Sequence, residues 1–78
     1  MSEFWCVTHV IFTTSKRLPV IFFGVETHEV KPENAFYEER TRTVTVDWFE
    51  TEKAARQHEK ALYGQRVILE RKKRLYVR

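Results

Sequence analysis

Few residues in this chain could carry catalytic or metal chemistry: one cysteine and three histidines, namely Cys6, His9, His28 and His58. The histidines do not have zinc-finger spacing to one another or to Cys6, so the local sequence predicts no metal site. If two N-terminal strands pair around residues 14–19, Cys6 comes roughly opposite His28. A Cys–His pair can act as a nucleophile, but it needs an orienting third group and a cleft. We interpret Cys6 and His28 as structural residues.

The remaining polar residues do not form a pattern typical of an active site. Glu38 and Glu39 are adjacent, so on a strand their carboxylates point to opposite faces. The two glycines lie forty residues apart, which leaves no phosphate-binding loop. His58 falls on an apolar helical stripe, where a histidine usually donates one hydrogen bond. We therefore expect no enzymatic activity, no catalytic residue, no metal ligand and no cofactor.

The strongest local signal is the basic run at residues 71–74. Residues 1–65 hold 8 basic and 10 acidic groups, whereas residues 66–78 hold 6 basic groups and 1 acidic group. Such an excess attracts anionic partners. It could contact phosphates, form one edge of a protein interface or only keep a strand end solvated. The predicted partner-binding residues are Arg66, Arg71, Lys72, Lys73, Arg74, Tyr76 and Arg78.

Length and composition restrict the class of protein. A chain of 78 residues is expected to form a single domain, residues 1–78. Its apolar content of 42% suits a packed core. A single cysteine excludes an intrachain disulfide, and the first residues lack the pattern of a signal peptide. The longest nearly apolar run, residues 18–25, is too short for a membrane helix. We expect a cytoplasmic protein without a membrane partner.

The secondary structure that must position these residues can be read from periodicity and turn signals. Segments rich in β-branched and aromatic residues predict strands, and Thr51 has the character of a helix N-cap. Gly64 is suited to end that helix. The expected strands span residues 4–13, 20–28, 36–49 and 66–78, the last as one strand or a hairpin, and the helix spans residues 52–63. The predicted fold class is α+β: an antiparallel sheet of four or five strands with one helix on one face, in the order β-β-β-α-β.

Alternation in the third strand predicts which side the helix covers. Val44, Val46 and Trp48 share one face, which we expect to be buried under the helix, and threonines and Asp47 occupy the other. A single helix leaves the second face of the sheet uncovered. Eleven aromatic residues are many for 78 positions, so we expect some of them to be exposed, among Trp5, Phe23, Tyr37 and Tyr63.

The strand pattern, the segment Trp48-Phe49-Glu50-Thr51-Glu52-Lys53-Ala54-Ala55, the amphipathic helix and the closing segment resemble small phage-encoded inhibitor proteins. These include early inhibitors of host RNA polymerase and anti-CRISPR proteins. The resemblance covers size and element order and implies non-enzymatic binding to a bacterial protein or ribonucleoprotein complex, in the cytoplasm of the host. The alternative is a small nucleic-acid-binding domain that uses the basic C-terminus. A homodimer is compatible with either function.

Overall fold

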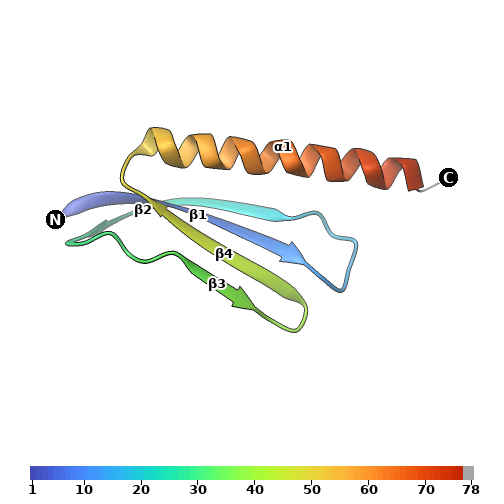
Figure 1. Ribbon diagram of the computed structural model, residues 1–78, viewed down its shortest axis with the longest axis horizontal. Coiled ribbons are helices and arrows are strands. Elements are labelled where there is room, and N and C mark those ends of the chain that lie inside the picture. The colour runs from blue at the N-terminus through green and yellow to red at the C-terminus, as the bar shows by residue number, and fades with distance from the viewer. Residues whose placement is uncertain (77–78) are drawn as a thin grey trace.

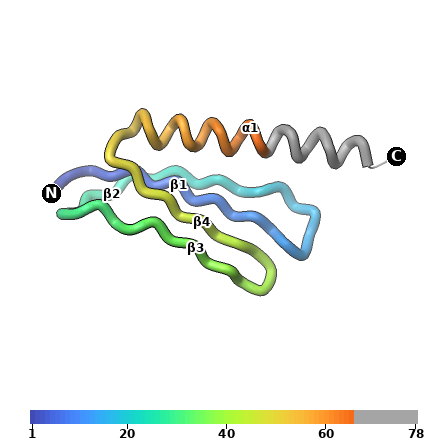
Figure 2. The backbone as a smooth tube through the Cα atoms, viewed as in Figure 1, coloured from blue at the N-terminus to red at the C-terminus, as the bar shows by residue number. Residues whose placement is uncertain are grey.

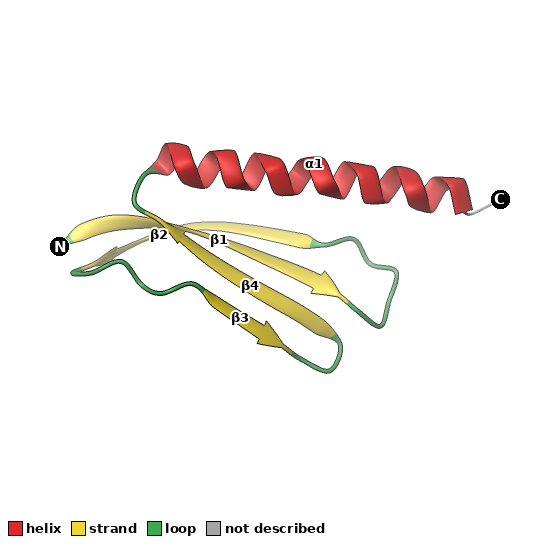
Figure 3. Ribbon diagram, in the orientation of Figure 1, coloured by secondary structure: helices red, strands yellow, loops and turns green. Residues whose placement is uncertain are grey.

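The computed structural model contains four strands and one long helix (Figure 1). It describes the backbone of residues 1–76 and the side chains of residues 1–65. The elements follow the chain in the order β-β-β-β-α (Figure 3). Their bounds are β1 Ser2–Phe12, β2 Val20–His28, β3 Ala35–Glu38, β4 Arg42–Phe49 and α1 Glu52–Tyr76.

The four strands form one antiparallel sheet in the order β2-β1-β4-β3. The helix α1 lies along one face of this sheet (Figure 2). Among the described residues it contacts β1, β2 and β4, and it does not contact the edge strand β3. The predicted fold class, an antiparallel sheet with one helix packed on one face, is therefore confirmed. The predicted order β-β-β-α-β is wrong in its last two elements.

The first hairpin forms where the sequence predicts it. β1 and β2 pair without interruption from Val10 opposite Val20 to Ser2 opposite His28. In this register Cys6 lies opposite Gly24, four residues away from His28 along β2. At about 3.3 Å per strand residue, that offset separates the two side chains by more than 10 Å. The expected juxtaposition of Cys6 and His28 is therefore wrong.

Residues 36–49 form a second hairpin, β3 and β4, and not the single strand that the sequence suggested. The turn lies within the charged run Glu38 to Arg42. The backbone N–H of Glu39 donates to the carbonyl oxygen of Arg42 at 2.8 Å, and the Arg42 Nε lies 2.7 Å from the Glu39 carboxylate. This run contains no apolar side chain to bury, so the chain reverses there at little cost.

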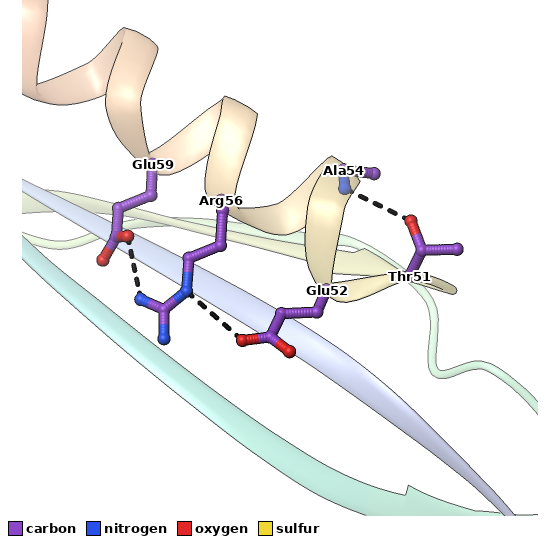
Figure 4. Close-up of polar contacts among 5 residues, drawn as sticks. All are labelled: Thr51, Glu52, Ala54, Arg56 and Glu59. Atoms are coloured by element: carbon purple, nitrogen blue, oxygen red, sulfur yellow. Dashed lines mark hydrogen bonds and ion pairs between the residues drawn. The ribbon is translucent and has the colours of Figure 1, made fainter.

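The start of α1 agrees with the sequence prediction. The Thr51 hydroxyl accepts a hydrogen bond from the backbone N–H of Ala54 at 3.2 Å, as an N-cap residue does (Figure 4). In the next turn Arg56 lies between two carboxylates, 3.7 Å from Glu52 and 3.1 Å from Glu59. The guanidinium of Arg56 also covers the ring of Phe23 on β2, at 3.6 Å from its centroid. These contacts fix the first turns of the helix against β2.

The helix does not end at Gly64, as predicted, but continues to Tyr76. Gly64 does not adopt a positive φ, so it cannot serve as a left-handed helix terminator. Arginine, lysine, glutamine, glutamate and leucine dominate residues 65–76, and all of them favour helix. Residues 66–76 therefore form the end of α1, and the predicted closing strand is wrong.

The core lies between α1 and the sheet. Val7 and Ala55 are fully buried, Leu62 is nearly so, and four larger side chains pack around them: Trp5, Ile21, Phe23 and Phe49. Because successive strand residues point to opposite faces, Phe49 beneath the helix places Trp48 on the other side. The prediction that Val44, Val46 and Trp48 lie under α1 is therefore wrong. Both faces of β1 are apolar, so the sequence pattern of β4 alone could not select the covered side.

Candidate functional site

The face of the sheet that α1 leaves uncovered, which we call the open face, is the main candidate for a functional surface. Residues directly opposite in an antiparallel pair point to the same face, so the strand registers identify its members. They alternate along each strand with the residues that face the helix. The apolar side chains of the open face include Val10, Phe22, Tyr37, Val44, Val46 and Trp48.

One end of the open face is organised around Phe4. Trp48 and His28, from the two strands that flank β1, approach each other edge to face with ring centroids 5.4 Å apart. Phe4 lies on β1 along the diagonal between them, and only 8% of its surface is exposed. The backbone N–H of Trp48 donates to the Asn34 side-chain oxygen at 2.7 Å, which continues the ladder beyond the end of β3. The rings at this end of the face are therefore held in position.

Between its two ends, the open face presents large apolar groups to solvent, and the most exposed of them lie on the edge strands. Phe22 on β2 is 58% exposed and Tyr37 on β3 is 55% exposed. Val44 and Val46 on β4 lie between them, half-buried, and Val10 on β1 is nearly buried. Aromatic side chains with this exposure are enriched at protein interfaces and are uncommon on free surfaces.

Charged groups occupy the two ends of the open face. At one end His28 Nε2 lies 3.3 Å from a carboxylate oxygen of Glu26. At the other end the guanidinium of Arg17 lies 4.4 Å from the ring centroid of Phe12, near the Glu39–Arg42 ion pair. An apolar centre with a charged rim is the arrangement found in protein–protein interfaces.

A separate polar cluster lies on the opposite side of the sheet, against α1. The Asp47 carboxylate on β4 lies 3.0 Å from His58 Nε2 on α1, and the His58 ring lies 5.3 Å from the ring of Phe49. Burial lowers the pKa of His9 on β1 from its ordinary value, and nearby His58 lowers this pKa further, whereas Asp47 raises it. Asp47 and His9 on the sheet and His58 on α1 thus form a polar contact within the layer between helix and sheet, which is otherwise apolar.

The described residues do not show other chemical sites. No group of three or more His, Cys, Asp or Glu side chains within residues 1–65 is arranged to hold a metal ion. The Cys6 thiol lies 3.7 Å from the Thr8 hydroxyl within β1. In the part of the chain that the structure describes, no helix has the length and apolar character needed to span a membrane.

The aromatic residues singled out from the sequence divide into two groups. Tyr37 and Tyr63 are exposed, at 55% and 42%, whereas Trp5 and Phe23 pack against the core under the helix. Sequence reasoning missed Phe22, which is the most exposed aromatic residue of the open face. The alternation of Phe22 and Phe23 on β2 was the available signal, because on a one-sided sheet only one of two adjacent aromatic residues can face the core.

The predicted basic site lies largely outside the described residues. The side chains of Arg66, Arg71, Lys72, Lys73, Arg74 and Tyr76 are outside them, and so is Arg78 as a whole. The backbone of residues 66–76 belongs to α1. The predicted basic strand beside exposed aromatic residues is therefore not formed.

Together these features define a small α+β domain with one apolar sheet face left uncovered. Comparisons of the chain with protein-family models, with curated proteins and with solved structures find no match.

Proposed function

We propose that this protein is a non-enzymatic binding protein that contacts its partner through the open face. The observation that carries the proposal is the exposure of Phe22 and Tyr37 around a half-buried valine centre, with charged groups restricted to the ends. Burial of this surface against a partner would release water from large apolar side chains that the chain itself does not cover. The fixed rings around Phe4 lower the entropic cost of binding, because they are already ordered.

The class of partner follows the sequence resemblance. Small inhibitors from phages and mobile elements dock on a bacterial protein or ribonucleoprotein complex, and we extend that partner class, the anti-CRISPR type of activity and a cytoplasmic location to this chain as part of the proposal. The open face suits a protein surface better than a phosphate backbone. Apart from the Arg17 and Arg42 end, its centre is apolar, whereas nucleic-acid sites are rich in cationic groups.

Site-specific photo-crosslinking tests this proposal. A photoreactive phenylalanine analogue is placed at Tyr37, and in a matched variant at Tyr63, an exposed aromatic residue on α1. Each full-length variant is mixed with bacterial lysate, with and without nuclease, and irradiated. We expect the Tyr37 probe to capture a defined bacterial protein that the Tyr63 probe does not, and expect nuclease treatment to leave this capture intact.

Binding measurements with the purified target complete the test. We expect Tyr37→Ser and Phe22→Ser each to weaken binding by about tenfold or more, as loss of a buried aromatic contact does. Tyr63→Ser is the control and should bind like the parent. Equal loss in all three variants, or unchanged binding in the two open-face variants, would contradict the proposed surface. Capture that depends on intact RNA or DNA would favour a nucleic-acid partner.

A further inference from the structure

We propose that two copies of this chain associate through their β2 strands, in antiparallel fashion, to form one continuous eight-stranded sheet. The strand that pairs with the outer edge of β2 is therefore the β2 strand of a second copy of the chain. This inference goes beyond the proposed function and does not depend on it, because it rests on the edge strand β2. Phe22 belongs to both proposed surfaces, whereas Tyr37 on β3 belongs to the open face alone. Three independent features of β2 carry the argument.

The first feature is that no described residue pairs with the outer edge of β2. β2 is nine residues long and pairs only with β1, whereas the other edge strand, β3, has four residues. The hydrogen bonds that the described loops, turns and caps make between backbone groups involve Thr13, Glu39 and Ala55, and none involves β2. The outward backbone groups of β2 are thus a template for another strand.

The second feature is that β2 lacks the devices that normally protect a sheet edge. Lysine, proline, a bulge or a very short strand usually prevents edge-to-edge association. β2 reads Val-Ile-Phe-Phe-Gly-Val-Glu-Thr-His, and its pairing with β1 is continuous. Glu26 is its single carboxylate, and Pro19 lies just before its first residue. An unprotected edge of this length is expected to be covered by another strand in the functional protein.

The third feature is Gly24, which nothing within the described chain requires. It does not adopt a positive φ, and a Cβ built on it meets no heavy atom within 4 Å. Glycine in a strand interior is unfavourable and often marks a close approach of another chain. Gly24 therefore leaves room on the open face for a side chain that this copy does not supply.

An antiparallel register centred on Phe23 makes β2 complementary to itself. In this register Phe22 of each copy lies opposite Gly24 of the other, where its ring fills the space above the glycine. An aromatic ring across from an edge glycine is a known stabilising pair. On the helix side, Ile21 lies opposite Val25 of the second copy, which is 54% exposed in the single chain. Apolar groups therefore meet apolar groups on both faces of the sheet.

The antiparallel pairing places a two-fold axis between the Phe23 residues of the two copies, and the charges near this axis are compatible with the pairing. Arg56, which covers Phe23, keeps Glu52 and Glu59 as partners, so no unpaired guanidinium is brought to the axis. Glu26 lies opposite Val20 of the second copy. The two Glu26 side chains are then separated by six strand residues, which is about 20 Å. Repulsion between them is weak at that distance in water.

Association of this kind would also enlarge the open face. The two-fold axis runs perpendicular to the sheet, so both helices lie on one side and both open faces on the other. Four strands at about 4.8 Å spacing and about 8 residues in length give a footprint of about 500 Å² for one copy. A standard protein interface covers about 800 Å² on each partner. The paired sheet, with about twice the footprint of a single copy, exceeds that area.

Sedimentation analysis of the full-length chain over a range of concentrations tests the inference. We expect a reversible monomer–dimer equilibrium in the micromolar range for the parent. Val25→Lys places a charge opposite the apolar Ile21 of the second copy, and we expect it to raise the dissociation constant by about tenfold or more. Thr27→Lys is the matched control, because it lies on the same face of β2 but outside the predicted contact. It should change the constant by less than about threefold.

Gly24→Val separates the proposed register from other modes of association. A valine there suits a monomeric strand, so the variant should fold and melt at or above the parent temperature. In the dimer it occupies the space assigned to Phe22 of the second copy, and we expect about tenfold weaker association. Hydrogen exchange of the outward β2 amides should slow as concentration rises, while residues 35–38 should not change.

Several outcomes would overturn the inference. A parent that stays monomeric throughout the concentration range would do so, and so would association that neither Val25→Lys nor Gly24→Val weakens. Dimerisation that Tyr37→Ser abolishes and Val25→Lys leaves intact would indicate contact between open faces, and it would refute pairing of β2 edges. Since the photo-crosslinking probe at Tyr37 lies on the opposite edge of the sheet, failure of the proposed function and failure of dimerisation can be distinguished.

Discussion

Replacement of Leu62 by alanine measures how strongly α1 is held on the sheet. Leu62 is 8% exposed and contacts the buried cluster of Val7 and Ala55. The substitution removes three carbon atoms, which at about 0.8 kcal/mol each correspond to about 2.4 kcal/mol of lost transfer free energy. The remaining cavity adds to this cost, and the total for a buried leucine is usually about 2–5 kcal/mol. Alanine forms helix slightly better than leucine, and this difference in helix propensity offsets only about 0.2 kcal/mol of the lost free energy.

The adjacent residue supplies a matched control. Tyr63 is 42% exposed, and Tyr63→Ala changes helix propensity in the same direction without opening a cavity in the core. We expect it to change the free energy of unfolding by about 0.5 kcal/mol or less. The difference between the two variants therefore reports the burial of residue 62 against the sheet.

The size of the domain makes this difference easy to measure. At about 0.05–0.15 kcal/mol per residue, the whole chain has a free energy of unfolding of about 4–12 kcal/mol. In a domain of this length about 1 kcal/mol shifts the melting temperature by about 4–8 °C, so the lost transfer free energy of about 2.4 kcal/mol should by itself lower it by about 10–20 °C in Leu62→Ala. Urea unfolding followed by tryptophan fluorescence gives the free energies directly. Variants that differ by less than about 0.5 kcal/mol would refute the packing of α1 through Leu62.

Three further predictions follow from the same structure. Gly64→Ala should stabilise the protein by about 0.5–1 kcal/mol in thermal unfolding, because Gly64 lies inside α1 without a positive φ; a destabilised variant would contradict the continuous helix. The lowered pKa of His9 means that the unfolded chain takes up this proton first, so stability should fall as the pH drops below the ordinary value of 6.5, and His9→Gln should flatten that dependence in urea titrations at several pH values. Replacement of residues 71–74 by serine takes the net charge from +3 to −1. We expect the parent to bind DNA and RNA weakly at two salt concentrations and expect little change in the variant. Micromolar or tighter binding by the parent at physiological salt would favour nucleic-acid binding over protein binding as the function.

Local signals explain the parts of the fold that the sequence predicts well. The first hairpin follows from a polar loop between two segments rich in β-branched and aromatic residues, and β2 has the predicted bounds. Thr51 caps the helix through an interaction three residues away. In both cases the deciding contacts lie close together in the chain, where residue type alone constrains the backbone.

The incorrect predictions depend on contacts that are distant in sequence. Both faces of β1 are apolar, so the side that α1 covers is decided by Trp5, Val7 and the residues of β2, and not by the alternation within β4. Asp47 faces the helix, where its carboxylate lies 3.0 Å from His58 Nε2, and a hydrophobicity pattern cannot anticipate such a polar contact. An uncovered face of the sheet was predicted, but Val44, Val46 and Trp48, which lie on that face, were assigned to the face under the helix.

The interior position of β1 has a consequence for how the chain folds as it is synthesised. β1 is made first, yet its two neighbours are β2, which ends at His28, and β4, which ends at Phe49. A two-stranded ribbon is only marginally stable in water, so β1 and β2 cannot form a lasting structure alone. The pairs between β1 and β4 join residues 30 to 44 positions apart, from Phe12 with Arg42 to Trp5 with Phe49. Contacts of this range form slowly, and the first strand keeps apolar groups exposed on both faces until β4 and α1 have been synthesised.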